Sequence, residues 1–129
     1  MGFFSKLFKR DQDDEGQDDP IHLDQELRKR QLLRLEKALD QLANEMRLCM
    51  STDNPGWRVR VNEYARLAGE AMTLRRREVT REGVLDLVFE VRPLYTGPAP
   101  AGQEHLIPLQ DAVLAAAEEL RVLAPSERG

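Results

Sequence analysis

The chain of 129 residues is long enough for one domain with a modest core, and its 33% of charged residues, against roughly 25% in an average domain, favour solvated helices. Its formal net charge of −4 at pH 7 gives no global field that would attract nucleic acid. One cysteine excludes an intrachain disulfide, two histidines far apart in sequence argue against a zinc site of the usual spacing, and no stretch approaches the roughly 20 apolar residues that cross a bilayer.

Residues 1–10 ("MGFFSKLFKR") contain three of the four phenylalanines of the chain, together with three cations. On a helical wheel one face is apolar and consists of Phe3, Phe4, Leu7 and Phe8. The cations lie around that face: Lys6, Lys9 and Arg10. This is the pattern of an interfacial helix, which places apolar rings at the acyl boundary and cations against anionic headgroups. We interpret residues 1–10 as an amphipathic docking peptide and not as a secretory signal, because acids follow where a cleavage site would lie.

Residues 11–19 form an acidic linker, in which six of nine residues are Asp or Glu. Like charges repel one another, so we expect this segment to be extended and unpacked. At its end, Asp19 followed by Pro20 matches the preferred N-cap and first residue of a helix. We therefore expect a helical domain over residues 20–123, with its first helix starting at this pair.

Residues 21–50 contain neither Gly nor Pro and predict a first helix of about 30 residues, roughly 45 Å long. Within it, apolar residues recur at alternating spacings of three and four, as in the seam of a coiled coil: Leu32, Leu35, Leu39, Leu42 and Met46. We expect this seam to pack against another helix, either inside a bundle or across a homodimer.

Residues 51–57 are predicted to end the first helix and to start a second one, because Asn54 can cap it and Pro55 fits its first turn. Trp57 begins an apolar stripe rich in small residues, which continues to Met72. A loop this short implies that the first two helices are antiparallel.

Residues 84–92 fit two patterns, because their apolar residues alternate as in a strand and also share one helical face. A strand needs a partner, and the only candidate, residues 57–61, would complete a marginal two-stranded sheet. We therefore predict a helix there, followed by a proline-rich loop at residues 92–108, a last helix at residues 109–123, and a frayed tail at residues 124–129.

No motif for catalysis stands out in the sequence. Neither the phosphate-binding loop nor the G-x-S-x-G nucleophile elbow occurs, and neither histidine has an evident partner. Carboxylate pairs on the predicted helices match solvated faces, whereas general acid–base catalysis needs a desolvated pocket that tunes a pKa. We therefore expect no enzyme activity, no catalytic residue, no metal or other cofactor, and no small-molecule substrate.

Two basic clusters offer an alternative kind of site. They comprise Arg28, Lys29, Arg30 and Arg34 on the first predicted helix, and Arg75, Arg76, Arg77 and Arg81 near the end of the second. Contact with a polyanion would need such cations on one face, matched to phosphates. No aromatic residue interleaves either cluster to stack on bases, and pairing with nearby acids or with a helix C-terminus accounts for the cations equally well. Nucleic acid is therefore the less favoured partner.

These features predict an all-α protein: a small antiparallel helical bundle of three or four helices with one long first helix, preceded by a short amphipathic N-terminal helix on an acidic linker. The predicted function is that of a non-enzymatic interaction or adaptor protein, which docks reversibly through residues 1–10 on the cytoplasmic surface of a membrane. Three alternatives stay open for that peptide: a groove of a partner protein in a larger assembly, a groove of its own domain, and disorder. The basic clusters leave open a nucleic-acid-associated or regulatory role. A single cysteine fits a reducing compartment, so we expect a cytoplasmic protein.

Overall fold

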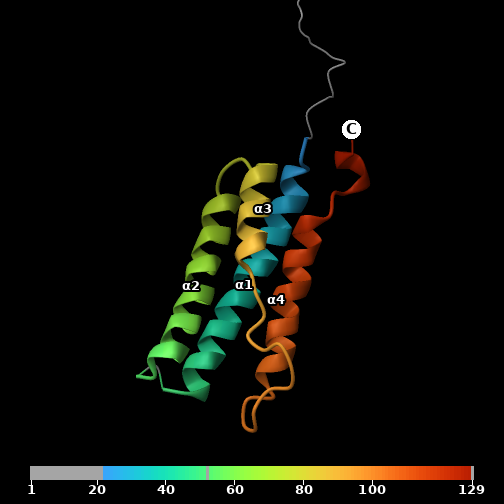
Figure 1. Ribbon diagram of the computed structural model, residues 1–129. Helices are drawn as coiled ribbons and strands as arrows, with labels where there is room; N and C mark the ends of the chain where they lie inside the picture. Colours follow the sequence, from blue (N-terminus) through green and yellow to red (C-terminus); the bar gives the residue numbers. More distant parts are fainter. Residues whose placement is uncertain (1–21, 52, 129) are drawn as a thin grey trace, which may run out of the picture.

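The computed structural model describes residues 22–51 and 53–128 of the chain. These ranges contain no strand, and their helices are α1 (Gln25–Cys49), α2 (Pro55–Arg75), α3 (Arg81–Glu90), α4 (Leu106–Arg121) and the short 3₁₀ helix η1 (Pro125–Glu127). The four α-helices lie alongside one another in an elongated bundle (Figure 1). The prediction of an all-α bundle with one long first helix is confirmed.

Helix α1 begins later than predicted. Asp24 caps it, because its carboxylate accepts a hydrogen bond from the Leu27 N–H at 3.1 Å. The N–H of Asp24 itself donates to Oε2 of Glu127 at 2.7 Å. This contact with a distant part of the chain fixes the extended entry into the helix, and the local sequence does not reveal it. The predicted helix is therefore wrong for residues 22–24, which are not helical, whereas Asp19 and Pro20 lie outside the described residues.

The turn between α1 and α2 agrees with the prediction. The side chain of Asn54 accepts a hydrogen bond from the Trp57 N–H at 3.1 Å, and Pro55 is the first helical residue. The indole Nε1 of Trp57 donates to the carbonyl oxygen of Met46 in α1 at 2.9 Å. The two helices pack against each other as an antiparallel pair, as Figure 1 shows.

The segment that fitted both a strand and a helix is helix α3, so the helical prediction is confirmed. The hydroxyl of Thr80 caps it by accepting a hydrogen bond from the Gly83 N–H at 3.1 Å. Its buried residues, Val84, Leu87 and Val88, lie at helical spacing and face the bundle.

Helix α4 starts at Leu106, before its predicted start, and the predicted proline-rich loop is correspondingly shorter. Pro108 is tolerated because it lies in the first turn, where the N–H that it lacks would have no intrahelical partner. Several hydrogen bonds tie the preceding loop to the bundle, and two of them are short. The N–H of Tyr95 donates to Oε1 of Gln110 at 2.7 Å, and the hydroxyl of Tyr64 donates to the carbonyl oxygen of Arg92, also at 2.7 Å.

The core lies where α1 packs against α2 and α4. All five residues of the predicted seam are fully buried in it: Leu32, Leu35, Leu39, Leu42 and Met46. The seam therefore joins helices of one bundle and leaves these five side chains no exposed surface for a second copy.

Candidate docking surfaces

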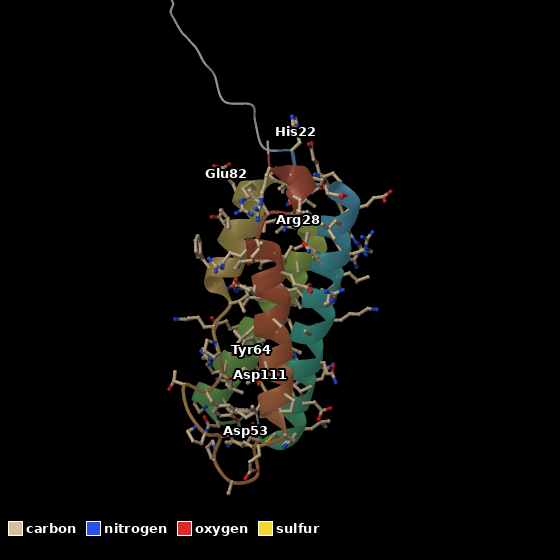
Figure 2. The ribbon with its side chains drawn as sticks, turned by 90° about the vertical axis from the view of Figure 1, so that its right-hand side faces the viewer. His22, Arg28, Asp53, Tyr64, Glu82 and Asp111 are labelled. Carbon is tan, nitrogen blue, oxygen red and sulfur yellow. The ribbon has the colours of Figure 1, made fainter. Side chains whose placement is uncertain are left out.

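The seven residues predicted to dock lie outside the described residues: Phe3, Phe4, Lys6, Leu7, Phe8, Lys9 and Arg10. The described chain starts at His22, at the end of the bundle where Glu82 marks the beginning of α3 (Figure 2). Asp53, in the turn between α1 and α2, lies at the opposite end (Figure 2). The segment before His22 therefore joins the bundle at the end where α2 stops and α3 begins.

Arg28, predicted as part of an alternative polyanion contact, is fully buried. Each of the five N–H donors of its guanidinium has an acceptor. Nε donates to Oε2 of Glu127 at 2.8 Å, and Nη2 pairs with Oε1 of the same carboxylate. The remaining donors reach the carbonyl oxygens of Leu120 and Val122, both at 2.9 Å, and Oε1 of Gln31 at 3.2 Å. No donor is left for an external polyanion, so the prediction for Arg28 is wrong.

Glu127 lies in η1, within the segment predicted to be a frayed tail, yet it is only 2% exposed. Besides Arg28, its carboxylate accepts the N–H of Ala124 at 2.8 Å and that of Asp24 at 2.7 Å. These donors, the Arg28 guanidinium first, lower the pKa of Glu127 to about 2. We call this ion pair the Arg28–Glu127 clasp. Because the clasp holds η1 against α1, the prediction of a frayed tail is wrong for residues 124–128.

The clasp is expected to make the stability of the bundle fall in acid. The pKa of Glu127 is lower in the folded chain than its ordinary value of 4.5, so the stabilisation is present above pH 4.5 and is lost as the pH falls toward about 2. For this buried group the shift corresponds to about 3 kcal/mol of unfolding free energy. Urea unfolding across this pH range should show that loss, and Glu127→Gln should be less stable at neutral pH and should show a flatter pH profile. Equal slopes for the two proteins would contradict the expectation.

The structure brings both basic clusters to the end of the bundle where α1 begins and α2 stops. Half of their eight cations already have partners, Arg28 among them. Arg34 pairs with Glu119 of α4, the Nε of Arg75 lies 2.7 Å from Oε1 of Glu36 in α1, and Arg81 donates to a carbonyl oxygen at the end of α4. Lys29 is half-buried, and the exposed cations of these two clusters that have no acidic partner among the described residues are Arg30, Arg76 and Arg77.

A groove between α2 and α3, which we call the α2–α3 groove, opens near the same end of the bundle. It encloses about 280 Å³ and is lined by two leucines, three carboxylates and one guanidinium: Leu74, Leu87, Glu70, Asp86, Glu90 and Arg77. The lining is thus both apolar and acidic, with a formal charge of −2. The Leu74 side chain packs against Gly83, where an added Cβ atom would lie 2.9 Å from Cδ2 of Leu74.

One large aromatic side chain lies outside the core beside this groove. Phe89 of α3 is 72% exposed and lines a neighbouring hollow, which shares Glu90 with the groove. Arg66 of α2 connects the two helices there, since its Nη2 donates to Glu90 at 2.8 Å and its Nη1 pairs with Glu70. The sequence analysis missed this surface. The sequence feature that points to this surface is Phe89, a large aromatic residue next to the buried face of α3. It can be recognised only once the segment is known to be a helix.

Neither a metal centre nor a membrane span is found in the described part of the chain. There, no group of three or more His, Cys, Asp or Glu side chains is arranged to hold a metal ion. None of the helices described has the length and hydrophobicity needed to traverse a bilayer.

The described residues thus define a small all-α bundle whose candidate sites are a basic end and an acidic, partly apolar groove. Comparisons of the chain with protein-family models, with curated proteins and with solved structures found no match. The function is therefore inferred from the residues themselves.

Proposed function

We propose that this protein is a non-enzymatic adaptor that docks reversibly on the cytoplasmic surface of a membrane through residues 1–10. The observation that carries the proposal is the sequence of that segment, with four large apolar side chains on one helical face and three cations around it. The linker at residues 11–19 supports it, because repulsion between six carboxylates and anionic headgroups would hold the bundle away from the membrane.

The balance of free energies favours weak docking. Four large side chains contribute about 1.5–3 kcal/mol each when fully buried, whereas ordering the peptide costs about 1 kcal/mol or more per residue. Three cations near an anionic leaflet add about 1 kcal/mol each. These terms nearly cancel, so a single peptide binds and releases readily. Two peptides presented by a homodimer would bind more tightly through their effective concentration.

Nucleic-acid binding is the less favoured role because several of the basic side chains already form hydrogen bonds or ion pairs within the chain. Arg28 has no free donor, and Arg34 and Arg75 are paired with acids of the same chain. A polyanion would have to displace these partners to contact the predicted set of eight cations.

Phe4→Asp/Phe8→Asp is expected to abolish co-sedimentation with vesicles of phosphatidylcholine and phosphatidylglycerol. The two carboxylates would have to be buried without partners when the peptide enters the acyl boundary, which opposes docking. Circular dichroism should show that the helix content of the variant equals that of the parent protein.

The matched control is Leu48→Asp/Val59→Asp, which adds the same charge at bundle positions that are 80% and 63% exposed. Vesicle binding should persist in this control. Equal sedimentation of Phe4→Asp/Phe8→Asp and the parent would refute the proposal. Binding to duplex DNA that falls steeply with salt and survives deletion of residues 1–10 would favour the nucleic-acid alternative.

A further inference from the structure

The surface around the start of α3 has charges that complement the N-terminal segment of the same chain. The α2–α3 groove combines two leucines with a formal charge of −2, and residues 1–10 combine four large apolar side chains with a charge of +3. At the end of the groove, Arg77, which lines it, and Arg76, which follows α2, are exposed without an acidic partner in the described chain, and residues 11–19 carry a charge of −6. The cationic residues 1–10 thus complement the acidic groove, and the acidic residues 11–19 complement the two arginines.

The segment joins the bundle close enough to reach this surface. His22, where the described chain starts, lines a hollow together with Glu78 and Thr80 of the turn between α2 and α3. Arg77 of the groove belongs to the same turn. When extended, the eleven residues 11–21 can span roughly 36 Å, whereas α3 has 10 residues and is about 15 Å long. The linker is therefore long enough to place the peptide anywhere along the groove.

We infer that the α2–α3 groove is the resting site of residues 1–10 when no membrane is present, with the acidic linker over Arg76 and Arg77. The phenyl rings pack beside the exposed Phe89, and the peptide cations face the carboxylates of the groove. Asp86 is the carboxylate most open to them, because it has no ion pair within the described chain, whereas Glu70 and Glu90 already share Arg66.

This inference deepens the proposed function and rests on it for one consequence: the peptide must leave the groove before it can dock on a membrane. A short flexible tether gives an effective concentration on the order of millimolar. A contact too weak to form between separate molecules is therefore populated within one chain, and it still yields to a membrane that offers a larger apolar surface.

Paramagnetic relaxation enhancement in the full chain tests the inference. Cys49→Ser combined with Ser5→Cys leaves one thiol, in the middle of the peptide, to carry a nitroxide. The amide signals of α3 and of the C-terminal half of α2 should lose intensity, while those of residues 51–54 at the opposite end of the bundle keep theirs. Raising the salt concentration should restore the lost signals, because it screens the charge contacts.

Two charge reversals on the labelled protein separate a specific contact from general attraction. Asp86→Lys, in the groove, should abolish the signal loss, whereas Asp40→Lys, at an exposed position of α1, should leave it unchanged. The inference is overturned if the loss is absent, lies elsewhere, or appears when nitroxide-labelled and isotope-labelled copies are mixed, which would report contact between molecules. The relaxation experiment contains no lipid, so a negative result would refute the groove contact and would not affect the vesicle result. Likewise, a failure to bind vesicles would refute the proposed function and would not affect the groove contact.

Discussion

Arg28→Met is expected to lower the free energy of unfolding by about 3–5 kcal/mol, the cost of leaving one partner of a buried ion pair uncompensated. The Glu127 carboxylate would keep the backbone donors of Asp24 and Ala124 but lose both contacts with the guanidinium. Since a domain of this kind has a total stability of about 5–15 kcal/mol, the loss would be a large fraction of it. Urea unfolding near neutral pH measures the difference.

Arg30→Met is the matched control, because it makes the same change at an exposed position two residues along α1. It should alter the stability by less than about 0.5 kcal/mol. Arg28→Met/Glu127→Met should recover much of the loss, because apolar side chains can replace a buried ion pair as a unit. If Arg28→Met and Arg30→Met unfold at the same urea concentration, the clasp does not stabilise the bundle.

Leu39→Ala is expected to cost about 2–5 kcal/mol of unfolding free energy, because it removes a fully buried side chain and leaves a cavity. Leu39 lies in the middle of the seam by which α1 packs on α2 and α4. Chemical denaturation monitored by circular dichroism gives the size of the loss.

Leu48→Ala, at an exposed position of the same helix, provides the control and should change the stability little. The midpoint of unfolding should also be independent of protein concentration for the parent and for Leu39→Ala. A midpoint that rises with concentration would show that folding is coupled to association. That result would contradict the conclusion that the seam of α1 packs within a single chain.

Features encoded locally were predictable from the sequence. Asn54 and Pro55 mark the start of α2 because a cap needs only its own neighbouring N–H groups. The seam of α1 was predictable because helical periodicity fixes which residues share a face. The choice of helix for residues 84–92 depended on the absence of a partner strand, and α3 confirms it.

Features that depend on residues far apart were not predictable. Arg28 lies in a basic run that is typical of a solvated surface, and Glu127 lies in a segment with the composition of a free end. Burial of either charge alone would be costly, so only the fold, which brings the two residues together, reveals that both are internal. The same long-range contact explains the misplaced start of α1, because Glu127 holds the N–H of Asp24.

Of the two parts of the candidate site, one was predictable from the sequence and the other was not. The proposed docking peptide stands out from the sequence, since its apolar residues and its cations lie within ten residues. The α2–α3 groove does not, because it depends on how α2 and α3 pack, with Leu74 beside Gly83, and on the register of α3, which leaves Phe89 outside the core.

The hydrogen bond between Asp24 and Glu127 has a mechanical consequence. A peptide held by a membrane would pull on the bundle at Asp24, and Glu127 would pass part of this load to η1. Through Arg28, the carbonyl oxygens of Leu120 and Val122 would carry the load into the end of α4. Such tension would therefore load α1 and α4 together, so the bundle is braced at the end where residue 22 enters it.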